Sequence, residues 1–179
     1  MRLSLTFRLG LLASLAVVIL ACQSKPKKQE LPFQTKEEYE STMIRSHQAF
    51  LKKEKARIQQ YIDSSGLDFK QSGTGLRYFI YEEGKGDTLK KGNIAVVKYQ
   101  LRLLEGDTLY ETKANEVQEF AVDFDNVERG LHEAVKKMRL GDKAILILPA
   151  HLAHGITGDQ AAIPTQATLV YDLHLVAKK

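Results

Sequence analysis

The first ordered pattern along the chain is a helical spacing of apolar residues between residues 36 and 66. Apolar side chains recur every three or four positions and charged side chains fill the other face, which is typical of an amphipathic helix. Thr35 and Glu38 have the spacing of a capping box, and Ser64-Ser65-Gly66 is a typical helix end. The pattern predicts one helix over 36–66, with apolar positions Tyr39, Met43, Ile44, Phe50, Leu51, Ile58, Tyr61 and Ile62.

Three apolar residues of this helix, Ile44, Leu51 and Ile58, stand seven positions apart. A helix that packs on its own domain needs one apolar face, and so does a helix that pairs with a second copy of the chain. Coiled-coil pairing normally requires three or more heptads, and this segment offers fewer. We therefore favour packing within the chain, and keep a homodimer through helix 36–62 as the alternative.

From Gly73 onward the pattern changes from a helical period to the alternation of strands. Runs rich in β-branched and aromatic residues are separated by turns that contain glycine, such as Glu105-Gly106-Asp107. One helical stretch, Val127–Met138, interrupts them. Antiparallel strands with one late helix indicate an α+β fold. The predicted strands are 76–81, 94–104, 108–112, 120–124, 144–148 and 168–176, with a loop over 149–166.

The first 22 residues have the pattern of an export signal. Arg2 and Arg8 form a positive start, and the uncharged run Leu9–Ala21 is too short for a comfortable membrane-spanning helix. The run ends at Cys22, the single cysteine of the chain, and the small Ala21 before it suits cleavage at that point. We expect a lipoprotein signal peptide over residues 1–21 and lipidation of Cys22. An ordinary signal or short anchor with an incidental cysteine is the alternative.

Residues 22–35 are predicted to be a tether, because they contain prolines and few apolar residues. Acyl chains on Cys22 would hold the chain on a membrane. Gln23 follows the cysteine, so the acidic signal that retains some lipoproteins at the inner membrane is absent. We therefore expect a lipid-anchored envelope protein, on the outer membrane and facing the periplasm.

Composition and charge exclude several function classes. The formal net charge of +4 includes a dense basic run, Lys25 to Lys28, beside the predicted anchor, and no basic stripe of a nucleic-acid binder follows. A single cysteine allows no internal disulfide, so stability must come from a packed core. His151 and His154 lie three apart, but no cysteine or close carboxylate pair accompanies them, which argues against a metal site. No hydrolase or phosphate-binding motif is complete, and we expect no cofactor.

The second half of the chain carries an ordered series of motifs. The strand with VVKY is followed by the hairpin, by VxRGLxEAVxxMxxGxKAxLxLP over Val127–Pro149, and by HG-x-TG…IP…ATLVYDLHLV over His154–Val176. This series resembles the FKBP-type peptidyl-prolyl cis-trans isomerases over residues 73–179. The resemblance implies a five- to six-stranded antiparallel sheet wrapped around the short helix 127–138, preceded here by the N-terminal helix. It also implies an apolar pocket between sheet and helix.

The chemistry of such a pocket needs no nucleophile, metal or cofactor. An Xaa–Pro bond isomerises over a barrier of about 18–20 kcal/mol, because the amide loses its resonance while it is twisted. A site that holds the twisted amide better than the planar one accelerates the exchange. Apolar walls suit the twisted amide, and a backbone N–H can hold a neighbouring carbonyl. We therefore expect aromatic and aliphatic side chains in the site rather than an acid–base pair.

Carried over position by position, the resemblance places an aromatic side chain at Tyr99 and a backbone N–H donor at Glu128. The chain departs from the family pattern at Leu109-Tyr110, where the family has Phe-Asp, at Leu131, where it has Trp, and at His154, where it has Tyr. These departures favour weak activity and poor binding of macrolide inhibitors. The predicted substrate-binding residues are Tyr99, Leu109, Tyr110, Phe120, Val127, Glu128, Leu131, His154, Ile163 and Tyr171.

Three functional hypotheses follow. The first is a peptidyl-prolyl cis-trans isomerase that assists the folding of exported proteins and binds their proline-containing segments. The second is a catalytically weak or inactive proline-binding or chaperone module, which the departures at Leu109, Tyr110 and Leu131 favour. The third is a structural part of an envelope machine, positioned by the helix 36–62.

Overall fold

The computed structural model of the chain describes residues 35–106 and 108–179. The predicted signal peptide, Cys22 and the tether up to residue 34 lie outside the described residues. The elements are helix α2 (Lys36–Ser65), β1 (Lys70–Gln71), β2 (Arg77–Glu82), β3 (Ile94–Leu103), β4 (Thr108–Glu111), β5 (Gln118–Ala121), helix α3 (Arg129–Val135), β6 (Lys143–Leu148), the 3₁₀ turn η1 (Ala150–Leu152) and β7 (Leu169–Lys178).

The predicted N-terminal helix is confirmed as α2. The Thr35 hydroxyl accepts a hydrogen bond from the N–H of Glu38 at 3.1 Å, as the capping box predicts. The helix stops where Gly66 takes a φ of +66°, a left-handed conformation that glycine adopts without steric cost. No helix among residues 35–106 and 108–179 combines the length and the apolar character that crossing a bilayer requires.

Contacts divide the chain into two compact units, residues 1–46 and residues 47–179. In the first unit the described residues form the opening turns of α2, where Tyr39, Met43 and Ile44 are exposed. The second unit joins the rest of α2 to all of the strands. The sequence predicts the helix 36–66 and the domain 73–179 as separate segments, whereas residues 47–65 of α2 belong to the same compact unit as the strands.

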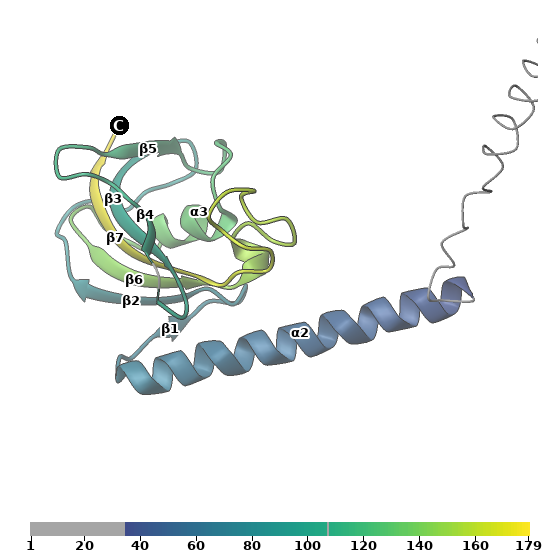
Figure 1. Cartoon of the computed structure of the whole chain (residues 1–179). Helices are drawn as coiled ribbons and strands as arrows, with labels where there is room; N and C mark the ends of the chain where they lie inside the picture. Colours follow the sequence, from purple (N-terminus) through teal and green to yellow (C-terminus); the bar gives the residue numbers. More distant parts are fainter. Residues whose placement is uncertain (1–34, 107) are drawn as a thin grey trace, which may run out of the picture. The chain divides into compact units, whose positions relative to one another are not determined.

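All strand pairs are antiparallel, and the order across the sheet is β1-β2-β6-β7-β3-β4, with β5 also paired to β3. Figure 1 shows the sheet curving around α3. Register shifts in β2 and β3 add local bends that help this curvature. The α+β fold predicted from the sequence is confirmed, and the described part of the chain has seven strands once the two-residue β1 is counted.

Two elements differ in extent from the sequence prediction. Helix α3 begins at Arg129 rather than Val127, because Glu128 has an extended ψ of 135°, and tight turns replace helix after Val135. Strand β5 occupies 118–121 rather than 120–124. The carboxylate of Asp125 accepts the N–H of Ala121 at 2.7 Å and closes a turn there, so the chain leaves the sheet at this point.

Alternation along the strands divides the apolar side chains between the two faces of the sheet. On β6, Leu146 and Leu148 belong to the main core, which lies on the α3 face. Between and beside them, Ile145 and Ile147 belong to a second cluster on the opposite face. Helix α2 covers that second cluster with Ile58, which is 4% exposed, and with its partly buried neighbours Tyr61 and Ile62.

Glu54 attaches α2 to the sheet through buried hydrogen bonds. Its side chain is buried, and its Oε1 accepts the N–H of Ala150 at 2.7 Å and the hydroxyl of Thr168 at 2.8 Å. Ala150 and Thr168 stand at the two ends of the segment between β6 and β7, called here the β6–β7 loop (149–168). One carboxylate oxygen on α2 therefore holds both ends of this loop.

The close approach of α3 to β6 yields a first prediction. A Cβ at Gly130 would overlap the side chain of Leu148 and lie 3.2 Å from the carbonyl oxygen of Leu152. Leu148 is fully buried and has little room to move. Gly130→Ala is therefore expected to lower the free energy of unfolding by about 2 kcal/mol, because overpacking outweighs the helix propensity that alanine adds. Chemical denaturation measures the change.

Gly73→Ala is the matched control for this variant, since a Cβ there meets nothing within 4 Å. Its free energy of unfolding should stay equal to that of the parent chain or rise by a few tenths of a kcal/mol. Equal stabilities of the two variants would contradict the close packing of α3 on β6.

Candidate functional site

A cavity of about 300 Å³ lies between α3, the inner face of the sheet and the β6–β7 loop. Nine of the ten residues predicted to bind substrate line it. The tenth, Leu109, packs against the main core and is not among the lining residues. The lining residues are Val97, Tyr99, Leu101, Tyr110, Gln118, Glu119, Phe120, Val127, Glu128, Leu131, His154, Asp159, Ile163 and Tyr171.

Aromatic side chains form much of the cavity wall. Tyr99 on β3 and Tyr171 on β7 meet edge to face, with ring centroids 5.5 Å apart. Phe120 on β5 is 4% exposed and stacks edgewise on His132 of α3, at 5.4 Å between centroids. These edge-to-face contacts restrict the orientation of the rings, so the aromatic wall of the cavity is preformed, as in most small-ligand pockets.

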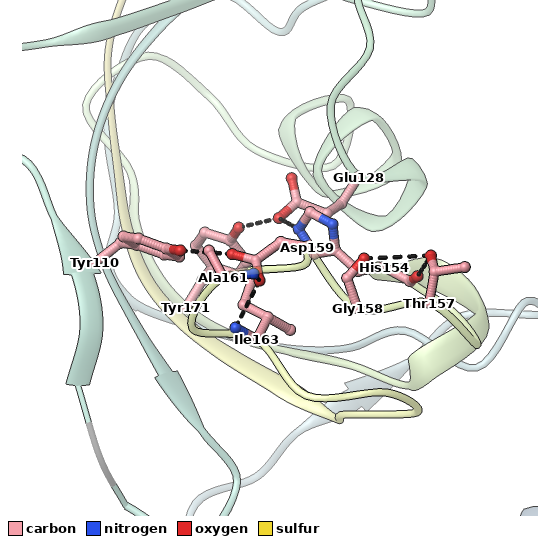
Figure 2. Close-up of polar contacts among 9 residues, drawn as sticks. All are labelled: Tyr110, Glu128, His154, Thr157, Gly158, Asp159, Ala161, Ile163 and Tyr171. Atoms are coloured by element: carbon pink, nitrogen blue, oxygen red, sulfur yellow. Dashed lines mark hydrogen bonds and ion pairs between the residues drawn. The ribbon is translucent and has the colours of Figure 1, made fainter. Parts of the chain in front are cut away.

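One carboxylate reaches into this apolar surrounding from the turn before α3. The Glu128 side chain is 10% exposed. Its Oε1 accepts hydrogen bonds from the Tyr171 hydroxyl and from His154 Nε2, the latter at 3.1 Å (Figure 2). Burial, followed by the charge of Glu128, raises the pKa of Tyr171 far above its ordinary value. Tyr171 therefore remains a neutral hydroxyl donor at physiological pH.

This arrangement affects the hydrogen-bonding role that we expect for His154. From the resemblance, its ring N–H was expected to donate a hydrogen bond in the pocket. In the structure the Nε2 atom of His154 is already bound to the carboxylate of Glu128. A substrate carbonyl would have to displace that carboxylate to use this donor.

A second polar pair stands at the cavity, between β4 and the β6–β7 loop. The Tyr110 hydroxyl donates to the carboxylate of Asp159 at 2.5 Å, and the other oxygen accepts the N–H groups of Ala161 and Ile163 (Figure 2). The Tyr110 hydrogen bond, helped by these two backbone donors, lowers the pKa of Asp159 to about 2. Asp159 is therefore ionised under all physiological conditions.

Sequence reasoning missed five of the lining residues. Val97 and Leu101 could have been found, because the alternation of the strand 94–104 places them on the same face as Tyr99. Gln118 and Glu119 lie next to Phe120, in the part of β5 that was not predicted as strand. Asp159 had no local signal, since its contact with Tyr110 joins positions that lie 49 residues apart.

Within residues 35–106 and 108–179, no group of three or more His, Cys, Asp or Glu side chains is arranged to hold a metal ion. The side chains that line the cavity offer apolar contact, hydroxyl groups, an imidazole and carboxylates. Such a set can bind and orient a polypeptide segment.

The Tyr110–Asp159 pair leads to a prediction about pH. Because the folded-state pKa of Asp159 is lowered, the stability it contributes is present above its ordinary pKa near 4 and is lost as the pH falls towards 2. Tyr110→Phe removes the largest cause of the shift, so the pKa of Asp159 should rise towards 4. A carboxyl NMR titration of Asp159 measures it.

Tyr81→Phe serves as the control for that titration. The Tyr81 hydroxyl donates to Asp172 at 2.7 Å, on strands β2 and β7 and away from the cavity. The pKa of Asp159 should not change in this variant. If Asp159 titrates near pH 2 in both variants, the hydrogen bond from Tyr110 does not set its pKa.

The comparisons with known proteins agree with this geometry. The profile of the family described as FKBP-type peptidyl-prolyl cis-trans isomerase matches residues 85–176. The Escherichia coli K12 protein named FKBP-type peptidyl-prolyl cis-trans isomerase FkpA is 31% identical over 165 residues, which is 89% of this chain and 60% of the relative. A probable FkpA of Neisseria meningitidis is 27% identical over 155 residues, 86% of this chain and 57% of the relative.

A solved structure resembles the fold as well. The crystal structure of a peptidyl-prolyl cis-trans isomerase from Pseudomonas syringae pv. tomato matches with a TM-score of 0.64 and 25% identity, over 74% of this chain and 95% of that chain. The chain spans about 60% of the length of the first curated relatives it matches.

Proposed function

Because the chain belongs to the FKBP-type peptidyl-prolyl cis-trans isomerase family, we propose that it catalyses the cis–trans isomerisation of Xaa–Pro bonds in exported proteins. The observation that carries the proposal is the cavity of about 300 Å³, which gathers aromatic and aliphatic side chains from the sheet, α3 and the β6–β7 loop. Its volume is at the lower end of the range for small-ligand pockets and suits a single prolyl ring.

The cavity would act by favouring the twisted amide. In the planar amide the carbonyl oxygen carries more negative charge and keeps its water more strongly, whereas the twisted amide is easier to desolvate. The rings of Tyr99, Phe120 and Tyr171 provide a surface that removes this water. An interaction that is stronger with the twisted amide than with the planar one lowers the barrier directly.

A backbone donor complements the apolar wall. Among the described residues, no protein acceptor pairs with the N–H of Glu128, which precedes the first turn of α3. A substrate carbonyl next to the prolyl bond would accept a hydrogen bond there, and this contact would fix the segment while the bond rotates. The nine predicted residues that line the cavity form the proposed substrate site.

The location of the proposed activity is the bacterial cell envelope. Support comes from the sequence of residues 1–22, which predicts export, lipidation of Cys22 and attachment to the outer membrane. A homodimer through helix 36–62 stays a proposal of the same kind. The exposed Met43, Ile44 and Leu51 support it, whereas Ile58, the third residue of the heptad spacing, packs against the sheet of its own chain. Sedimentation in mild detergent of the full chain and of a chain without residues 36–46 tests the dimer. Loss of a dimer would halve the measured mass.

Catalysed refolding tests the proposed activity. The full chain, in mild detergent, is added to a protein whose slow refolding phase is limited by prolyl isomerisation, a step of roughly 10–100 s without catalyst. The slow phase should shorten in proportion to the concentration of the chain. A detergent-only sample is the blank.

The same assay also tests the second hypothesis, a proline-binding module with weak or no catalysis. His154 is bound to Glu128, so a proline segment could be captured with little rate enhancement. An unchanged slow phase together with binding of the unfolded protein would establish the binding module in place of the isomerase.

A further inference from the structure

Acidic side chains outnumber basic ones among the residues that line the cavity. Three carboxylates line it, those of Glu119, Glu128 and Asp159, and no lysine or arginine is among the lining residues. His154 is the one histidine among the lining residues, and its Nε2 faces Glu128. The electrostatic potential inside the cavity is therefore negative, although most of its surface is apolar.

Glu128 is the carboxylate that matters most, because its side chain is 10% exposed, compared with 39% for Glu119. Its Oε1 accepts two hydrogen bonds, from Tyr171 and His154, whereas none of the described residues donates to its Oε2. A carboxylate that is 10% exposed in apolar surroundings normally has an opposite charge nearby, since removing it from water is costly. The remaining oxygen is thus a preformed acceptor for a cationic ligand group.

The other two carboxylates differ in how much of their charge is available. Glu119 at the rim lies 2.6 Å from the ammonium of Lys179, which neutralises much of its charge. Asp159 has no cationic side chain as a hydrogen-bond partner, because its donors are the Tyr110 hydroxyl and two backbone N–H groups. Glu128 and Asp159 are therefore the two lining carboxylates without a lysine or arginine partner, and His154 is the basic side chain beside them.

We propose that the cavity selects segments in which a lysine or arginine stands next to the proline. This inference rests on the proposed function and specifies its substrate class. The prolyl ring occupies the apolar wall, and the long flexible side chain of the neighbouring residue brings its cation to Glu128 and Asp159. The alkyl stem of that side chain buries against the apolar lining on the way, as lysine and arginine stems commonly do.

A peptide series measures the preference. Peptides that differ only in the residue before proline, lysine, leucine or glutamate, are mixed with the full chain in mild detergent, and cis–trans exchange is followed by NMR. The lysine peptide should have a kcat/KM about tenfold above that of the leucine peptide, and the glutamate peptide should have the lowest value. The advantage of lysine should shrink as salt is added, because salt screens the charges.

Charge-removing variants identify the residue responsible. Glu128→Gln keeps the size and the hydrogen-bond acceptor of the side chain but removes its charge, so the lysine-to-leucine ratio should fall to about twofold or less. Glu82→Gln is the control, because Glu82 pairs with Lys143 at 2.8 Å and does not line the cavity. Its ratio should match that of the parent chain. An unchanged ratio in Glu128→Gln would overturn the assignment to Glu128.

The outcomes separate this inference from the proposed function. If every peptide exchanges at its uncatalysed rate, the isomerase activity fails, and an NMR binding titration with the same three peptides then tests the preference by affinity. If leucine and lysine peptides exchange or bind equally well, the preference is overturned while the isomerase activity stands. The parent chain alone decides this point, so it holds even if a variant does not fold.

Discussion

Replacing Glu54 with alanine is expected to lower the free energy of unfolding by roughly 3 kcal/mol, because the N–H of Ala150 and the hydroxyl of Thr168 would lose a charged acceptor inside the protein. The same change should lower catalytic activity. Both ends of the β6–β7 loop are held by Glu54, and that loop carries His154, Asp159 and Ile163 to the cavity. Chemical denaturation and prolyl-exchange rates measure the two effects.

Glu105→Ala is the matched control for Glu54→Ala. Glu105 also links α2 to the sheet, through an ion pair with Arg57, but its side chain is 60% exposed. Exposed ion pairs contribute about 0–1 kcal/mol, so this variant should lose little stability and no activity. Equal losses in the two variants would mean that attachment of α2 in general, rather than the buried carboxylate, supports the loop.

Removal of one aromatic wall is expected to have the largest effect on catalysis. Tyr99→Ala deletes the ring that packs against Tyr171 at 5.5 Å between centroids. Loss of about 2–3 kcal/mol of contact with the twisted amide corresponds to a decrease of kcat/KM of roughly 30- to 100-fold. The prolyl-exchange rate of a short peptide measures it, after circular dichroism has shown that the variant is folded.

Two further variants make this result specific. Tyr99→Phe keeps the ring and should stay within about twofold of the parent chain, since the proposed role is apolar contact. Tyr81→Ala removes a tyrosine from β2, which does not line the cavity, and should leave kcat/KM unchanged. A Tyr99→Ala chain with full activity would remove this ring from the proposed site.

The long elements were predictable because each repeats one period over many residues. Helix α2 follows the helical spacing from Lys36 to Ser65, and the alternation of β3 and β7 covers ten residues each. Short elements carry less signal. The turns at both ends of α3 and the turn after Ala121 depend on local hydrogen bonds, such as the one from the Ala121 N–H to the Asp125 carboxylate, which periodicity does not reveal.

In the candidate site, too, some residues were predictable from the sequence and others were not. The aromatic positions Tyr99, Phe120 and Tyr171 followed from the family resemblance, whose motifs lie within continuous stretches of sequence. The cluster of Glu128, His154 and Tyr171 joins three segments that meet only in the folded chain. Glu54 is harder still to predict, because a glutamate on a helix is normally solvated, and its partners are 96 and 114 residues away.

The apolar cluster beneath α2 has a consequence for how this protein is produced. A chain that begins at Gly66 would keep all of the described strands but lack Ile58, Tyr61 and Ile62 of α2. Ile147 and Val170 would then face water as a hydrophobic stripe on the outside of a β-sheet. Such surfaces promote self-association. A shortened version is therefore expected to aggregate at concentrations where the whole second unit, residues 47–179, stays dispersed.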